Sequence, residues 1–331
     1  MINVYLRRGD SIECLTLLPG MHLPLPALWI DLHNPTDAEK ETLERALELS
    51  LPTREAMQEI ESSSRFYTEG HIFRMTATVL ANADGPNPSA ESLAFILCPG
   101  GLITLRYSDP RPISSFAIRL TRQPSAHLNA RDILIGLLEA FVDRLADILE
   151  RIGVDLDTLS QQIFDTRPST ARRRVGERRD LQAILKNLGR NEDLTSNIRE
   201  SLLSLTRLIR FITPEFETNT RNGLKELRTR LKSLRSDIIS LNEHSTFESH
   251  KVNFLLDATL GMISIEQNRI IKIFSVAAVV FLPPTLVASI YGMNFHYMPE
   301  LSWLFGYPTA LGLMVLSAIV PFLYFRRMGW L

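Results

Sequence analysis

Two long apolar runs stand near the C-terminal end of a chain that is otherwise rich in charge. The first extends from Ile270 to Ile290 and the second from Gly306 to Phe325. Each has about the length that a helix needs to cross a bilayer. Pro283 and Pro284 interrupt the first run, but membrane helices tolerate proline where neighbouring groups satisfy the freed carbonyls. The pattern therefore predicts two transmembrane helices.

Positive charge flanks each apolar run on one side only. Arg269 and Lys272 stand at the start of the first run, Arg326 and Arg327 follow the second, and the segment 291–305 contains no Lys or Arg. Because Lys and Arg concentrate on the cytoplasmic side, we expect both termini in the cytoplasm and the loop outside. The N-terminal residues contain no apolar run of signal-peptide length. The expected location is the inner (plasma) membrane.

Three long helices are predicted before the membrane segment. Apolar residues recur by threes and fours from Ala130 to Ile163, which is typical of one face of a helix. A second helix is expected over about 170–212, ending near Pro214. The third begins near Thr218 and has no proline until Pro283, so it continues into the first apolar run. Some 70 residues at 1.5 Å each give a rod of roughly 100 Å, with the polar segment 242–249 as a weak point.

The N-terminal part has the shorter periodicities of an α/β domain. Thr36 and Glu39 have the spacing of a capping box at the start of a helix predicted over 36–49. The turn sequence Pro99-Gly100-Gly101 predicts a hairpin, and Ala83–Pro88 is expected to form a surface loop. Short apolar or alternating runs predict strands at Ile2–Arg7, Leu93–Cys98, Leu102–Tyr107 and Ser115–Leu120.

These elements give a three-part organisation. We expect a cytosolic α/β domain at 1–128 and a long-helix stalk at 129–268. A transmembrane domain follows at 269–331, with spans at 270–291 and 306–325 and an outer loop at 292–305. The fold class is thus an α/β domain, a long α-helical stalk and two C-terminal transmembrane helices.

Composition excludes several functions. The net charge is −1, without the basic excess of a nucleic-acid binder. The two cysteines, Cys14 and Cys98, are too few for a disulfide scaffold. The seven histidines are scattered, and we find no phosphate-binding loop, dinucleotide fingerprint or catalytic triad. No enzymatic activity is expected.

One face of the third predicted helix carries mostly small or hydroxylic residues, and we call it the small-residue stripe. At steps of four and three, its members are Asp257, Gly261, Ser264, Asn268, Ile271, Ser275, Ala278, Leu282, Thr285, Ser289 and Gly292. Such a stripe has two interpretations. Small residues allow close packing of membrane helices in a dry seam. Alternatively, several copies of the helix surround an axis and line a channel.

In the channel interpretation, rings of polar side chains from Asn268, Ser275, Thr285 and Ser289 face a hydrated ion. Ile271 and Leu282 form apolar constrictions that gate by dewetting. Asp257 places a ring of carboxylates below the inner mouth. One such helix cannot enclose a pore, so this interpretation requires a homo-oligomer.

The stripe leads directly into the motif Tyr291-Gly292-Met293-Asn294-Phe295, followed by Met298-Pro299-Glu300-Leu301. Here the sequence resembles the CorA family of magnesium and cobalt transport proteins, whose signature is Gly-Met-Asn at the outer end of the first C-terminal span. The resemblance covers about the last 80 residues, including the Arg326-Arg327 end. It implies a funnel-shaped homopentamer in a lipid bilayer, with the long helix lining the pore.

The resemblance also implies roles for individual residues. Gly292, Met293 and Asn294 form an outer selectivity filter. Asn268 and Ile271 match inner polar and apolar collars, and Leu282 and Thr285 match pore positions between them. His296 stands where the family often has an acidic residue, while Glu300 remains in the outer loop. Family members are regulated by Mg²⁺ bound through cytosolic acidic residues, for which Asp109 and Asp237 are candidates.

The implied cargo is Mg²⁺, which also serves as the regulatory ion, with Co²⁺ and Ni²⁺ as alternative substrates. Mg²⁺ dehydrates reluctantly, so amide oxygens that hydrogen-bond its waters suit it. The membrane potential supplies the driving force. Two alternatives remain: a Zn²⁺ transporter of the same superfamily, and a non-conducting coiled-coil scaffold anchored in the membrane.

Overall fold

A computed structural model of the chain describes residues 1–9, 11–18, 21–59, 61–85, 87–122, 128–164, 180–218, 224–293, 296, 298–299 and 303–330. The chain divides into two compact units, Met1–Leu255 and Leu256–Leu331. The predicted division into three parts stays a prediction. Helix α7 (Leu224–Tyr291) begins in the first unit and continues into the second.

The first unit contains a seven-stranded mixed sheet. Its strand order is β2-β1-β3-β7-β6-β5-β4, and β3–β7 is the parallel pair while the other neighbours are antiparallel. The hairpin expected at Pro99-Gly100-Gly101 is confirmed, since Cys98 pairs with Gly101. The strands are β1 (Ile2–Arg8), β2 (Ser11–Leu17), β3 (Trp29–His33), β4 (Phe66–Glu69), β5 (Ile72–Ala81), β6 (Ser89–Cys98) and β7 (Gly101–Arg106).

Helices cover both faces of this sheet. Short helices lie on one face: α1 (Asp37–Leu47), α2 (Arg54–Gln58) and α3 (Ser62–Arg65). The capping box predicted for α1 is present, with Thr36 and Glu39 bonded reciprocally. Leu43 and Met57 from these helices join alternate strand residues such as Val4 and Leu32 in one apolar core. On the other face lie α4 (Arg111–Arg122), α5 (Ala130–Phe164) and α6 (Leu181–Thr218).

The strand predicted at Ser115–Leu120 is wrong, because these residues belong to α4. Ile113, Phe116 and Leu120 are its buried apolar residues, at helical spacings of three and four. The Phe116 ring packs edge-on against Trp29 at 5.8 Å, whereas Ile118 is 53% exposed. The short alternation in sequence was thus part of an amphipathic helix docked on the sheet.

Three long helices run together in the first unit: α5, α6 and the first part of α7. Arg230 of α7 forms a two-pronged contact with Glu139 of α5 at 2.9 and 2.6 Å. Residue 180 precedes α6 outside any helix, and the predicted start near residue 170 lies outside the described residues. Pro214, the predicted end, lies inside the helix instead. The long continuous helix predicted from the sequence is confirmed, with the segment 242–249 helical throughout.

The second unit consists of the end of α7, a connecting segment and α8 (Gly306–Arg327). Both α7 and α8 are long and apolar enough to cross a membrane, and only 6% of each apolar window is buried. Both helices contain the prolines noted in the sequence: Pro283 and Pro284 in α7, and Pro321 in α8. The two apolar runs noted in the sequence are therefore helical, with α7 ending at Tyr291 and α8 beginning at Gly306.

Candidate functional site

The small-residue stripe is open along its whole length in the single chain. Every member from Asp257 to Gly292 is exposed. The two apolar members, Ile271 and Leu282, are 60% and 65% exposed. A side chain such as Leu282 is not expected to face water on its own, so this surface requires either lipid or another copy of the chain.

On the opposite face of the same helix segment, other residues of the chain cover the side chains. None of the covered positions belongs to the stripe. At 3.6 residues per turn, they lie on roughly the opposite side of the helix. The buried or half-buried positions between 271 and 291 are Val276, Ala277, Val280, Pro283, Pro284, Val287 and Tyr291. Apolar and small hydroxylic side chains are thus sorted onto different faces.

The hydroxyl group of Thr285 is oriented by the helix. Its Oγ1 donates a hydrogen bond to the Phe281 carbonyl at 2.7 Å. Because the hydrogen points back into the helix, the oxygen lone pairs remain available on an exposed side chain. The waters of a hydrated cation present hydrogens outward, so a hydroxyl fixed as an acceptor suits such a ligand.

The two prolines beside Thr285 alter the helix locally. Pro283 and Pro284 lack the N–H groups that would bond to the carbonyls of Val279 and Val280. The backbone nevertheless stays helical through both positions. The first predicted span therefore carries two carbonyl oxygens without their usual amide donors.

Helix α7 ends where the Gly-Met-Asn motif begins. The Gly292 amide donates to the Ala288 carbonyl at 3.0 Å and the Met293 amide to the Ile290 carbonyl at 3.3 Å. A Cβ atom at Gly292 would lie 3.1 Å from the Ala288 carbonyl oxygen, which is tighter than an ordinary contact. Asn294 and Glu300 lie outside the described residues. The structure therefore describes only the first two members of the predicted filter.

Charges and aromatic rings lie at the end of the second unit away from the Gly-Met-Asn motif. The Lys272 ammonium lies 5.8 Å from the centre of the Trp330 ring. Arg326 and Arg327 form the last turn of α8. Lysine, arginine and tryptophan at one end of two apolar helices have the composition of a membrane interface.

The two candidate regulatory residues, Asp109 and Asp237, have different surroundings. Among the described residues, no group of three or more His, Cys, Asp or Glu side chains could hold a metal ion. Asp237 is exposed on α7. Burial raises the pKa of Asp143 on α5, Arg119 opposes this, and the charges of nearby carboxylates including Asp237 add to the rise. Asp237 therefore lies near other acidic groups, whereas Asp109 has a cationic partner.

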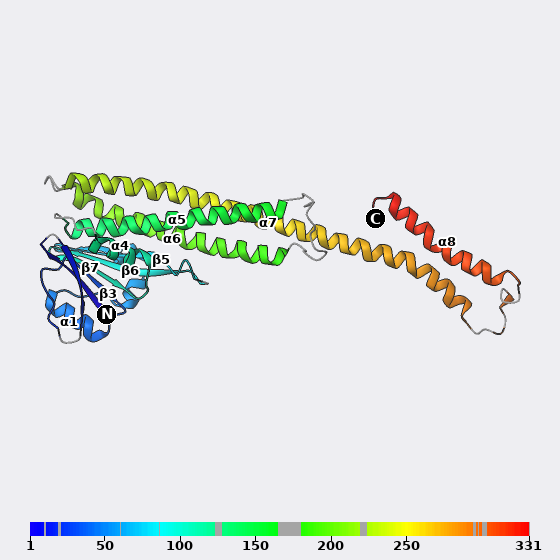
Figure 1. The fold of residues 1–331 in the computed structure, drawn as a ribbon, viewed down its shortest axis with the longest axis horizontal. Helices are drawn as coiled ribbons and strands as arrows, with labels where there is room; N and C mark the ends of the chain where they lie inside the picture. Colours follow the sequence, from blue (N-terminus) through cyan, green and yellow to red (C-terminus); the bar gives the residue numbers. More distant parts are fainter. Residues whose placement is uncertain are drawn as a thin grey trace. The chain divides into compact units, whose positions relative to one another are not determined.

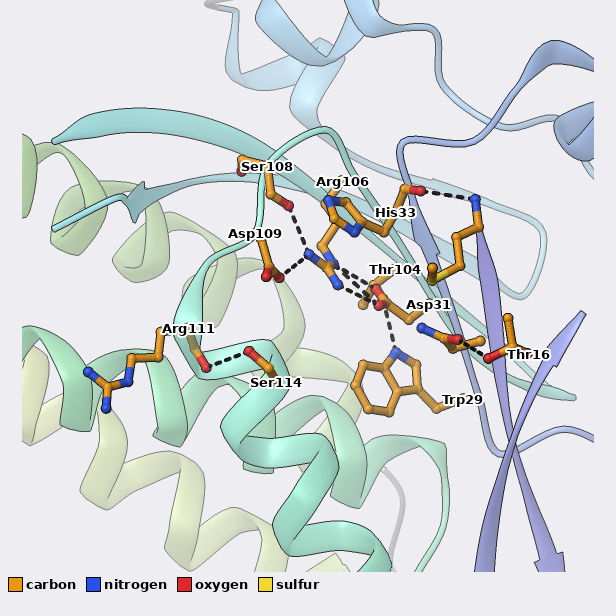
Figure 2. A network of polar contacts seen from close by, with 12 residues as sticks. Thr16, Trp29, Asp31, His33, Thr104, Arg106, Ser108, Asp109, Arg111 and Ser114 are labelled. Atoms are coloured by element: carbon orange, nitrogen blue, oxygen red, sulfur yellow. Dashed lines mark hydrogen bonds and ion pairs between the residues drawn. The ribbon is translucent and has the colours of Figure 1, made fainter. Parts of the chain in front are cut away.

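Asp109 belongs to a polar network that sequence patterns did not reveal (Figure 2). Arg106 binds Asp109 at 2.6 Å and the buried Asp31 at 3.0 Å. Thr104 donates to Asp31 at 2.7 Å and Trp29 donates to Thr104 at 3.0 Å. Burial opposes the charge on Arg106, but hydrogen bonds to Asp31 raise the pKa of its guanidinium.

This network joins the two parallel strands at the centre of the sheet. Asp31 stands opposite Thr104 in the register of β3 and β7. The signal in the sequence was a charged residue inside each of two apolar strands, at Asp31 and Arg106. Asp109 is the exposed member of this network, and its Oδ1 accepts a hydrogen bond from Arg106.

Comparisons with known proteins agree with these features. The family model described as "CorA-like Mg2+ transporter protein" matches residues 27–327. A protein of Pasteurella multocida named magnesium transport protein CorA is 39% identical over 305 residues, covering 92% of each chain. One of the same name from Yersinia pseudotuberculosis is 38% identical over 306 residues, again with 92% coverage of each.

Solved structures share the fold. The complete structure of the CorA magnesium transporter from Methanocaldococcus jannaschii matches with a TM-score of 0.72 at 17% identity, covering 100% of this chain and 99% of that one. The full-length CmaX protein matches with a TM-score of 0.64 at 14% identity, covering 100% and 98%. At these identities the likeness concerns the fold alone.

Proposed function

This chain belongs to the family of CorA-like Mg²⁺ transporters, and from this we propose that it is a divalent-cation channel through which hydrated Mg²⁺ enters the cell. Relatives covering 92% of the chain are named magnesium transport proteins. The proposal goes further in naming the conducting surface, which is the small-residue stripe of α7. Transport, rather than catalysis, is the activity of such a protein.

The sorting of residues on α7 carries this proposal. The covered face is apolar, while the stripe on the opposite side is small and hydroxylic and is left open. A single helix cannot enclose a path, so the stripe must be completed by further copies. We propose a homopentamer in the inner membrane, with both termini cytoplasmic, as the family resemblance and the Lys/Arg distribution imply.

The proposed path suits an ion that keeps its water. Side chains of Asn268, Ser275, Thr285 and Ser289 offer neutral dipoles, and Mg²⁺ retains several waters in most sites. A ring of carboxylates at these positions would hold a divalent cation too tightly to release it. Asp257, with its full charge, lies before the apolar segment and would concentrate cations near the inner mouth.

The filter is proposed at Gly292, Met293 and Asn294. The amide of Asn294 would hydrogen-bond the waters of the ion and select it by the size of its hydrated form. Co²⁺ and Ni²⁺ form hexahydrates of similar size, so we propose them as further substrates. Ala278 belongs to the same path as a small spacer, and Glu300 adds negative charge to the outer loop.

The driving force is the membrane potential. Moving one charge through 100 mV is worth about 2.3 kcal/mol, so a divalent ion gains about twice that. For regulation by cytosolic Mg²⁺, Asp237 is the stronger of the two candidates, because the carboxylate of Asp109 already binds Arg106.

Ion influx into liposomes tests the proposal. The purified full-length protein is reconstituted with a Mg²⁺-sensitive dye inside, and an inside-negative potential is imposed. We expect influx that hexaamminecobalt(III) blocks, since this octahedral complex resembles the hydrated ion but does not exchange its ligands. Asn294→Ala should abolish the influx or remove its preference for Mg²⁺.

Two outcomes would contradict the proposal. An intact oligomer without any influx would favour a membrane-anchored scaffold. Influx of Zn²⁺ alone, coupled to protons, would favour a zinc transporter of the same superfamily. The matched control is Val287→Ala on the covered face of α7, which should conduct as the wild type does.

A further inference from the structure

A cavity of about 380 Å³ lies between α5, α6 and the β5–β6 loop, within the first unit. Hydrogen-bonding side chains from both helices line much of it: Arg151, Thr158, Gln162, Asn187, Arg190 and Asn191. Its volume is within the range of small-molecule sites. Neither the stripe nor the Arg106 network reaches this cavity.

The β5–β6 loop at the edge of this cavity carries the carboxylate of Asp84, which arginine side chains surround. Asp84 accepts hydrogen bonds from Arg144 at 2.6 Å, Arg151 at 2.8 Å and Arg111 at 3.2 Å. Arg190 of α6 donates to the neighbouring Gly85 carbonyl at 2.9 Å. Three helices thus direct guanidinium groups at one loop tip, and an oxyanion already occupies the place where they meet.

The charged residues that line the cavity itself are balanced in number. Four guanidinium groups meet around Asp84 and Gly85, but only those of Arg151 and Arg190 line the cavity, together with the carboxylates of Asp84 and Asp155. Arg111 and Arg144 line a neighbouring cavity, as does Asp109. The hydrogen bond from Arg151 contributes most to lowering the pKa of Asp84 to about 2, together with the charge of Arg144. Asp84 is therefore ionised at any physiological pH, and an incoming anion must compete with it for Arg151.

We propose that this cavity binds a small phosphate-bearing anion, whose oxygens take the guanidinium groups of Arg151 and Arg190 in competition with Asp84. The guanidinium fork matches carboxylate and phosphate geometry alike, so a group that holds Asp84 also suits phosphate. A phosphate carries more charge than a carboxylate and offers more acceptor oxygens. The amide side chains of Asn187 and Gln162 supply further donors around the same space.

Calorimetric titration of the detergent-solubilised full-length protein with inorganic pyrophosphate, in Mg²⁺-free buffer, tests this site. We expect saturable binding that Arg151→Gln weakens at least tenfold. Asp84→Asn should tighten binding several-fold, because it removes the competing internal anion. Arg122→Gln, at the exposed end of α4, is the matched control and should bind as the wild type does.

Asp84→Asn should tighten pyrophosphate binding, whereas Arg151→Gln should weaken it. In a purely structural cluster, Asp84→Asn would lower the melting temperature without improving any binding. Arg190→Gln, which removes the other proposed phosphate-binding guanidinium but no bond to Asp84, should also weaken binding at least tenfold and replaces Arg151→Gln should that variant fold poorly. Absence of saturable binding in both wild type and Asp84→Asn would overturn the proposal. Sulfate binding as tightly as pyrophosphate would also overturn it. The readout does not use transport, so its result is independent of the proposed function.

Discussion

Single apolar residues decide whether water fills the proposed path. Ile271 and Leu282 are the apolar members of the stripe within the first span, and both are exposed in the single chain. Rings of such side chains exclude water from a narrow pore. Replacing one ring by hydroxyl groups should remove this barrier.

We therefore expect Leu282→Ser to raise Mg²⁺ influx into liposomes roughly tenfold, which corresponds to a barrier lower by about 1.4 kcal/mol. Val280→Ser changes a half-buried residue on the covered face and should not raise influx. Equal influx for Leu282→Ser and wild type would show that Leu282 is not a constriction.

The buried ion pair of Asp31 and Arg106 contributes to the stability of the folded protein. The side chains of these residues are 2% and 6% exposed. Removing one member of a buried pair leaves the other charge uncompensated, which costs about 3–5 kcal/mol. We expect Arg106→Met to lower the melting temperature of the purified protein by several degrees, as followed by circular dichroism.

Arg122→Met, at the exposed end of α4, is the control and should leave the melting temperature unchanged. An unchanged melting temperature in Arg106→Met as well would mean that the network contributes nothing to stability. The same variant removes the cationic partner of Asp109.

At the scale of elements, α7 contains a polar layer within the first unit. Ser245, Glu248 and Ser249 are buried, and Ser249 donates to Glu192 of α6 at 3.0 Å. Among the described residues, the Glu248 Oε2 atom is buried without a hydrogen-bond partner. A Cβ atom at Gly153 of α5 would lie 3.2 Å from the other oxygen of Glu248.

A buried carboxylate oxygen without a hydrogen-bond donor destabilises the helix bundle. We expect Glu248→Leu to raise the melting temperature, and Glu243→Leu, at an exposed position of the same helix, to leave it unchanged. A lower melting temperature in Glu248→Leu would show that the contact of the other carboxylate oxygen with His244, at 3.6 Å, outweighs this cost.

Sequence periodicity identified the long elements and some of the short ones. The strands predicted at Ile2–Arg7, Leu93–Cys98 and Leu102–Tyr107 correspond to β1, β6 and β7. The rod of α7 and the two spans followed from runs of 20 residues or more, where the pattern is strong. The helix α4 was missed because Ser115–Leu120 alternates over a few residues, and only packing against Trp29 reveals its helical face. The bond from Arg106 to Asp31 joins residues 75 apart, which no local pattern predicts.

The candidate site shows the same division. The stripe could be predicted because it needs only the helical period. The sequence alone did not tell which face of α7 is covered, because burial depends on how α7 packs within the second unit. The arginine cluster at Asp84 was also invisible to periodicity, since its members come from three helices and a loop.

At the scale of the whole molecule, the proposed channel requires several copies of the chain. We expect native mass spectrometry of the purified protein to give five times the 37.5 kDa mass of the chain. In a background without native cysteines, Ser264→Cys lies on the stripe and should form a disulfide between copies on mild oxidation. Lys232→Cys, exposed but not on the stripe, is the control. A monomer that conducts would contradict this arrangement.

If the small-residue stripe lines a water-filled path, a cysteine placed on it should react with a water-soluble reagent and block that path. Cys14 and Cys98 are first replaced by Ala, and Ser289→Cys or Val287→Cys is introduced. A membrane-impermeant, positively charged methanethiosulfonate is applied from outside during Mg²⁺ influx into liposomes. We expect influx to stop in Ser289→Cys and to continue in Val287→Cys. Continued influx in Ser289→Cys with a fully modified thiol, or block only in Val287→Cys, would show that the stripe does not line the path.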